Sequence, residues 1–128
     1  MMTTVTPAPV LIFVYKRLEP LKQTIERLKE NTLAKESTVY IFSDGPKKEN
    51  DAEDINRVRN YIKTVDGFRE VIIMEAPSNR GLATSIISGV NYVFQTHQSL
   101  IVLEDDLLTT PNFLTFMNDS LARYKAEP

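Results

Sequence analysis

The sequence predicts an α/β fold in which a mostly parallel four-stranded sheet is flanked by helices. Four short runs of apolar and β-branched residues alternate with four amphipathic segments along the 128 residues. This alternation is typical of a parallel sheet with right-handed crossovers and helices on both faces. Each apolar run also leads into a polar segment, and ligands of such sheets gather at the carboxyl ends of the strands. We therefore expect the functional residues along one edge of the sheet.

The predicted strands cover 9–15, 38–42, 69–75 and 100–103. Their content of Val, Ile, Phe and Tyr favours strand over helix. The third run carries charged residues at both ends, which predicts a position near the edge of the sheet. The fourth run has no polar interruption, so we expect it to be covered on both faces.

The helices are predicted from apolar residues that recur with helical spacing between charged ones, as Ile55, Val58 and Ile62 do. Pro20 suits the first turn of the first helix, and Pro111 suits the first position of the last, with Thr110 as its N-cap. The expected helices run from about Pro20 to Asn31, over 50–65, from Leu82 onward and from Pro111 onward.

Composition indicates one soluble domain. Hydrophobic residues make up 42% and charged residues 25%, and no apolar run approaches the roughly 18 residues that span a bilayer. The first nine residues lack the pattern of a secretory signal, and the absence of cysteine fits a reducing compartment. A net charge of −2 and a pI of about 5.4 argue against nucleic-acid binding. We expect a cytoplasmic protein, at most peripheral to the inner face of a membrane.

Three consecutive carboxylates, Glu104, Asp105 and Asp106, follow the last predicted strand. Adjacent carboxylates repel one another, and a divalent cation that prefers oxygen ligands is the usual compensation. The alternative is a solvated turn in which one Asp caps the next helix. Cations on the same edge, such as Arg17, would suit a ligand in which phosphate is bridged to a metal ion.

Several nucleotide sites are excluded by the residues. Neither a Walker A sequence nor Gly-x-Gly-x-x-Gly occurs in the chain. A flavodoxin-like receiver domain has the right length and fold class, but its acidic pocket needs carboxylates after the first strand. This chain has Tyr15, Lys16 and Arg17 there, which makes a receiver a weaker alternative.

Four segments together resemble the nucleotide-binding half of GT-A glycosyltransferases, which has a Rossmann-like fold. They are the 9–17 strand and loop, the 39–44 strand that ends in Asp, the 79–83 loop (Asn-Arg-Gly-Leu-Ala) and the 103–107 segment (Leu-Glu-Asp-Asp-Leu). The chain is most similar to the N-acetylglucosaminyltransferase I type and to family 2. In that type a Glu-Asp-Asp version of the Asp-x-Asp motif precedes a Pro-x-Phe helix start, here residues 111–113. The resemblance covers essentially the whole chain.

The resemblance implies a metal role for the acidic segment. Asp106 would ligate Mn²⁺ (or Mg²⁺) that bridges the two phosphates of a UDP-sugar. Asp105 and Glu104 would act through water or on the ribose.

It also implies roles for residues on the other loops. Tyr15 and Arg17 would border the nucleotide, Asp44 would accept the imino N–H of uracil, and Asn79 and Arg80 would lie near the uracil or a phosphate. From the residues alone, Tyr15 could instead be a core aromatic, and Asp44 could form a local turn before Gly-Pro.

The function implied is inverting transfer of a hexosyl or N-acetylhexosaminyl group from a UDP-sugar to a carbohydrate or glycoconjugate acceptor, as in carbohydrate biosynthesis. Such transfer needs a carboxylate base, which in this family lies beyond the Asp-x-Asp strand. We therefore expect residues 1–128 to be a single N-terminal nucleotide-sugar-binding domain, truncated before the acceptor-binding half. The alternatives are a non-catalytic nucleotide-binding or regulatory domain and the receiver.

Two further residues are interpreted as structural. His97 is expected near the carboxyl end of the third helix, where the helix dipole favours a cation. Asp119 falls off the apolar stripe of the last helix, so we expect it to be exposed rather than to serve as a base.

Overall fold

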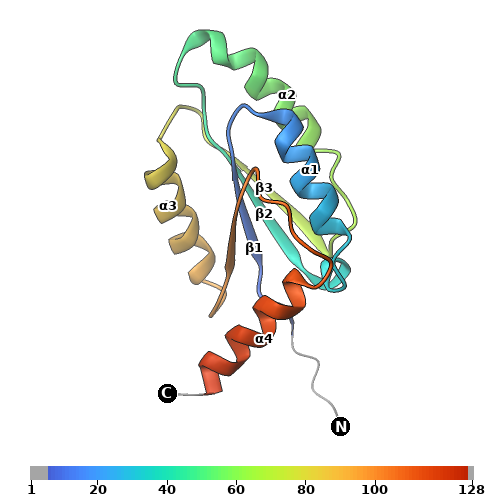
Figure 1. Cartoon of the computed structure of the whole chain (residues 1–128). Coiled ribbons are helices and arrows are strands. Elements are labelled where there is room, and N and C mark those ends of the chain that lie inside the picture. The colour runs from blue at the N-terminus through green and yellow to red at the C-terminus, as the bar shows by residue number, and fades with distance from the viewer. Residues whose placement is uncertain (1–5, 127–128) are drawn as a thin grey trace.

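A computed structural model describes residues 6–126, and its architecture is the predicted one. Four parallel strands pair in the order β3-β2-β1-β4, between helices on both faces (Figure 1). The position of β3 at an edge confirms the prediction made from its polar ends. The elements are β1 (Val10–Val14), α1 (Leu18–Lys29), β2 (Thr38–Ser43), α2 (Ala52–Ile62), β3 (Glu70–Glu75), α3 (Leu82–Phe94), β4 (Ile101–Glu104) and α4 (Phe113–Ala126), with short 3₁₀ turns at Ala34–Glu36 and Glu49–Asp51.

The helices divide between the two faces of the sheet (Figure 1). One face is covered by α1 and α2, whose Leu21, Ile25 and Val58 pack with the strands in the larger apolar core, and Leu114 of α4 joins them. The other face is covered by α3, whose Val93 packs with Leu11 and Phe13 of β1 and Tyr40 of β2 in a smaller core. None of the helices in the described part of the chain combines the length and apolar character needed to cross a bilayer.

The centre of the sheet is β1, in which every residue is buried. From β1 the chain crosses to β2 on one side, and much later it returns as β4 on the other side. The strand order therefore reverses between β1 and β4. The segments that follow these two strands lead away from each other at the carboxyl end of the sheet. Sheets of this kind open a ligand crevice there, at the carboxyl ends of the two strands.

The expectation that the last strand is covered on both faces is wrong. Ile101 and Leu103 are buried against the α1 and α2 face, but Val102 keeps 42% of its surface exposed on the α3 face. The cause is the placement of α3, which packs over β1 and leaves the neighbouring edge strand partly open. The side chains of β4 therefore alternate between core and surface, although all but the last residue of the strand are apolar.

The start of the last helix also differs from the prediction. The first helical residue is Phe113, and the backbone N–H of Phe113 donates to the carbonyl of Thr110 across a turn at 3.1 Å. Thr110 is therefore not the N-cap. A distant residue satisfies the helix start instead, because Asn31 Oδ1 accepts the backbone N–H of Leu114 at 2.8 Å. Asn31 Nδ2 also donates to Thr109 Oγ1, which ties the end of α1 to the segment after β4.

The two residues interpreted as structural lie close to their predicted places. His97 lies three positions beyond the last residue of α3, and its ring meets Tyr40 edge-on at 6.1 Å between ring centroids. Asp119 is exposed on α4, as expected.

The close approach of α3 to the sheet depends on Gly89. A Cβ at this position would lie 2.9 Å from the ring of Phe13 and 3.2 Å from that of Phe42. These two rings are stacked on each other at 5.0 Å, so neither can move away freely. Ala is normally the better helix former, but here the steric conflict is the larger effect.

We expect Gly89→Ala to lower the free energy of unfolding by about 1 to 2 kcal/mol, because overpacking costs more than the gain in helix propensity. Urea denaturation measures the change. Ser88→Ala, at the adjacent exposed position, is the matched control and should be neutral or slightly stabilising. A Gly89→Ala protein more stable than the parent would contradict the packing argument.

Candidate functional site

The carboxyl ends of β1, β2 and β4 and the loop after β3 surround a crevice of about 410 Å³. Its lining includes five of the residues that the sequence singled out, namely Tyr15, Arg17, Asp44, Asn79 and Asp105. The crevice opens where the strand order reverses, as the fold class predicts. These residues come from four different connections and still meet at one edge of the sheet.

Arg17 joins the first loop to the acidic segment. Its Nη2 lies 3.2 Å from Asp105 Oδ1 and 3.4 Å from Asp106 Oδ2. The Asp105 side chain is only 15% exposed, whereas that of Asp106 is 47% exposed. The backbone of the acidic segment is also held in place, because Thr24 Oγ1 of α1 donates to the carbonyl oxygen of Asp105 at 2.9 Å. Arg17 and Asp105 therefore line the crevice together, whereas Asp106 is not one of its lining residues and is joined to them through Arg17.

The third acid lies apart from this group. Glu104 is the last residue of β4 and is exposed, in register with Phe13 of β1. In the described residues, the ion pairs of Arg17 go to Asp105 and Asp106 and none goes to Glu104.

The acidic segment suits a divalent cation that is shared with a ligand. Within residues 6–126 there is no group of three or more His, Cys, Asp and Glu side chains that could enclose a metal ion. Mg²⁺ and similar hard cations are, however, commonly held by one or two carboxylates together with water and substrate phosphates. The carboxylate oxygens of Asp105 and Asp106, as metal ligands, fit this second kind of site.

Asp44 is the most heavily hydrogen-bonded carboxylate of the crevice. Its oxygens accept the backbone N–H groups of Gly45 at 2.8 Å, Arg80 at 2.9 Å and Gly81 at 3.0 Å, and the side-chain amide of Asn79 at 3.2 Å. Asp44 therefore holds the 79–81 loop at the start of α3, where Gly81 has the positive φ of +84° that the turn requires. The bond from Gly45 is the one local contact among these four, and it is not an Asx-type turn, because the residue two positions after Asp44 is Pro46, which has no N–H to donate.

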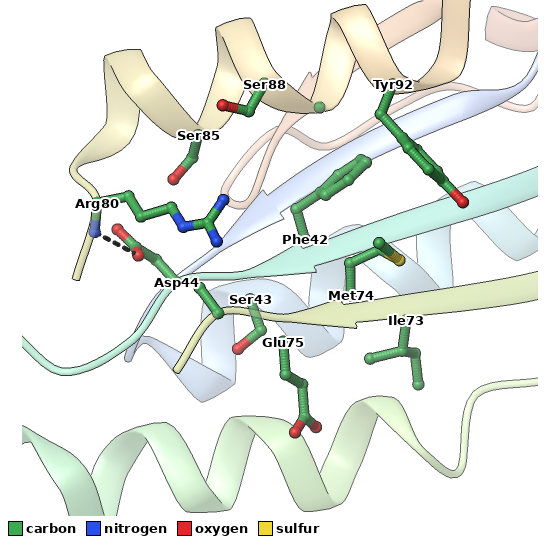
Figure 2. Close-up of a pocket in the computed structure, with 12 residues that line it drawn as sticks. Phe42, Ser43, Asp44, Ile73, Met74, Glu75, Arg80, Ser85, Ser88 and Tyr92 are labelled. Carbon is green, nitrogen blue, oxygen red and sulfur yellow. Dashed lines mark hydrogen bonds between the residues drawn. The ribbon is translucent and has the colours of Figure 1, made fainter. Parts of the chain in front are cut away.

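Arg80 extends into a second cavity beside the first. This cavity has a volume of about 420 Å³ and lies between α3 and the ends of β2 and β3. Figure 2 shows the Arg80 side chain reaching toward Ser85 and Phe42, while its backbone N–H is bonded to Asp44. Asp44, Phe42 and Ser85 line both cavities, so the two lie side by side.

Arg59 was not singled out from the sequence, yet it braces the site from α2. Its guanidinium donates to Ser43 Oγ at 2.9 Å and to the carbonyl oxygens of Ser43, Asp44 and Ala76 at 3.3, 3.2 and 2.8 Å. The ends of β2 and β3 are thereby held together beneath Asp44. A signal was available, because Arg59 lies four positions after Ile55, on the buried stripe of a charge-rich helix.

Asp51 was also missed, and it connects two loops of the crevice. Its carboxylate accepts the hydroxyl of Tyr15 at 2.9 Å and Nζ of Lys16 at 3.1 Å. The Tyr15 oxygen in turn accepts the backbone N–H of Lys47 at 2.8 Å. In the sequence Asp51 is one of several acids at the start of a helix, a pattern that the helix dipole explains without any further role.

The pKa values of the three ionisable side chains are shifted, those of Asp51 and Lys16 mainly by these contacts and that of Tyr15 mainly by burial. Hydrogen bonds from Lys16, and then from Tyr15, hold the pKa of Asp51 below its usual range. The hydrogen bond between Lys16 and Asp51 also raises the pKa of Lys16. Burial is the main reason that the pKa of Tyr15 is raised. At neutral pH the carboxylate is charged and both of its donors keep their protons.

We expect Arg59→Met to lower the free energy of unfolding by about 2 to 3 kcal/mol, because four hydrogen bonds from a charged donor are lost at a mostly covered position. Urea denaturation measures the loss. Arg57→Met is the matched control, since Arg57 is exposed and forms surface ion pairs with Glu53 and Asp54 of the same helix. Equal losses in the two variants would contradict the bracing role.

The lowered pKa of Asp51 predicts a pH dependence. Such a group stabilises the fold above its unfolded-state pKa and loses this effect as the pH falls through its folded-state pKa. The stability difference between the parent and Asp51→Asn should therefore be largest at neutral pH and shrink as the pH falls below the usual carboxyl range. Urea denaturation over a pH series measures it, with Asp54→Asn as control. A difference that does not change with pH would be evidence against the ionised network.

Comparison with known proteins assigns the family. The profile described as glycosyl transferase family 2 matches residues 10–126. No curated protein matches the chain. Among solved structures, the crystal structure of S. aureus TarS is similar over 93% of this chain, with a TM-score of 0.62 and 11% identity, a likeness that shows the fold. The chain spans 20% of the TarS chain. The GT-A fold implied by the resemblance is confirmed, and the chain belongs to glycosyl transferase family 2.

Proposed function

We propose that this chain binds a UDP-sugar through Mn²⁺ or Mg²⁺ and is the donor-binding domain of an inverting glycosyltransferase. The donor would carry a hexosyl or N-acetylhexosaminyl group, and the acceptor would be a carbohydrate or glycoconjugate. The observation that supports this most directly is the pairing of Arg17 with Asp105 and Asp106 at the mouth of the crevice. Family membership favours glycosyl transfer over the receiver alternative.

The charges at the mouth suit a diphosphate with its cation. Without a ligand, Arg17 is the positive charge nearest to the two aspartates. A divalent cation on Asp106, with Asp105 acting through water, would take over this compensation. Arg17 could then turn its guanidinium to a phosphate oxygen, a pairing for which its fork of donors is well suited. Glu104 would act on the ribose or through water.

The uracil would occupy the part of the crevice bordered by Tyr15, Asp44 and the 79–80 loop. A volume of about 410 Å³ is in the range of small-molecule sites. Asp44 already accepts four donors, and the Asn79 amide at 3.2 Å is the longest of these bonds. If the imino N–H of uracil replaced this amide, the three backbone bonds to Asp44 would stay intact. Asn79 and Arg80 could then donate to carbonyl oxygens of the base.

The chemistry of transfer follows from charge. When bound, the divalent cation supplies Lewis-acid stabilisation of the negative charge that grows on the departing diphosphate. Asp106 and Asp105 would hold the cation, and Arg17 would neutralise the remaining phosphate charge. The carboxylate base that deprotonates the acceptor is proposed to lie outside these residues. Nucleotide binding is therefore the activity to test on this chain.

We expect Asp106→Ala to abolish the gain in UDP affinity that Mn²⁺ gives to the parent, because the proposed metal ligand is lost. Calorimetry with UDP, with and without Mn²⁺, measures this, and a gain of at least about tenfold is expected for the parent. Asp119→Ala is the matched control, an exposed carboxylate on α4. Circular dichroism checks that each variant is folded. Equal metal-dependent affinity in the parent and Asp106→Ala would refute the assignment.

A further inference from the structure

We propose that Asp51 is a positioning residue of the crevice, which it does not line itself. Its carboxylate fixes the ring of Tyr15 and the Lys47 backbone as two walls of the site. The consequence for nucleotide affinity rests on the function proposed above, whereas the positioning itself does not.

The contacts of Asp51 run between loops that are far apart in the sequence. The bond to Tyr15 spans 36 residues and the bond to Lys16 spans 35. Tyr15 and Lys47 line the crevice, and Asp51 lies behind them with only 9% of its surface exposed. A carboxylate in this place joins the loop after β1 to the loop after β2.

The local role of such a residue does not explain these contacts. Asp51 precedes the first residue of α2, where an Asp side chain usually accepts a backbone N–H of the helix. No such bond is made from this position. Both carboxylate oxygens are directed to the other loop instead, one to the Tyr15 hydroxyl and one to Lys16 Nζ. The side chain therefore stabilises the arrangement of the loops rather than the start of the helix.

This arrangement decides which part of Tyr15 a ligand can use. The hydroxyl donates its one proton to Asp51 and also accepts the N–H of Lys47, so it has no proton left to donate to a ligand. The ring is the part left to face the crevice. An aromatic face held in one orientation suits stacking with a planar base and loses little freedom when the base binds. The effect of Asp51 should therefore be on the base, and not on the phosphates.

The first experiment uses the ligand-free chain. Amide hydrogen exchange at Lys47, followed by NMR, should accelerate roughly tenfold in Asp51→Ala and in Tyr15→Phe, because the acceptor of this N–H is loosened or removed. Asp51→Asn keeps an oxygen acceptor for the Tyr15 hydroxyl and should restore part of the protection. Glu53→Gln is the control, since Glu53 is exposed and forms a surface ion pair with Arg57 on the same helix. Unchanged exchange in Asp51→Ala would overturn the proposal.

The second experiment measures affinity for UMP and for UDP with Mn²⁺. Asp51→Ala and Tyr15→Phe should each weaken both ligands by a similar factor, roughly tenfold, and the double variant should be no weaker than either single one. A uniform loss of fold stability would not produce this non-additivity. Additive effects, or a loss confined to UDP with Mn²⁺, would overturn the role of Asp51 through Tyr15. If the parent binds neither nucleotide, the proposed function fails and amide exchange alone decides the role of Asp51.

Discussion

The site depends on the parallel pairing of β1 with β4, which brings together residues that are 88 positions apart in the chain. Arg17 follows one strand, Asp105 and Asp106 follow the other, and the shared direction puts all three at the same end of the sheet. An antiparallel β4 would send the acids to the opposite end. The cost of crowding two carboxylates is reduced by the guanidinium between them, and that balance is what a cation and a phosphate could take over.

Three charged side chains, Asp44 in the crevice wall and Arg59 and Asp51 outside its lining, hold the walls in place. Asp44 binds the 79–81 loop, Arg59 joins the ends of β2 and β3, and Asp51 joins the loops after β1 and β2. Across the described residues, no buried side-chain nitrogen or oxygen lacks a hydrogen-bond partner. Each of these three charged side chains makes hydrogen bonds to groups on another element. Hydrogen bonds that involve a charged group are stronger than neutral ones. The loops of this edge are therefore ordered before any ligand arrives.

The parts of the fold that follow from periodicity could be predicted from the sequence. The four strands, the four longer helices and the edge position of β3 all agree with the structure to within a few residues. The prediction failed where distant contacts decide the outcome. Val102 is exposed because of where α3 packs, and α4 starts at Phe113 because Asn31 supplies an acceptor from the end of α1.

The residues of the candidate site likewise divide into those that the sequence pattern predicts and those that it does not. The acids, Arg17 and Asp44 stand out because they follow strands. The structure places Arg17, Asp44 and Asp105 in the lining of one crevice, with Asp106 paired to Arg17 and Glu104 apart from them. Arg59 and Asp51 lie in a charge-rich segment. The spacing from Ile55 places Arg59 on the buried stripe but does not say what it binds, and no apolar spacing separates Asp51 from the solvated acids around it. Their partners are backbone carbonyls and a tyrosine hydroxyl on other loops, which no local pattern specifies.

The acidic segment is secured at two points by α1 and the turn that follows it. Thr24 of α1 donates to the carbonyl oxygen of Asp105, and Asn31, two positions beyond the end of α1, donates to Thr109 Oγ1 and accepts the N–H of Leu114. Between these anchors, Leu107 and Leu108 are largely exposed. Hydrogen bonds therefore hold both ends of this segment. An adjustment to an arriving cation is confined to the residues around Asp106, and the rest of the sheet need not move.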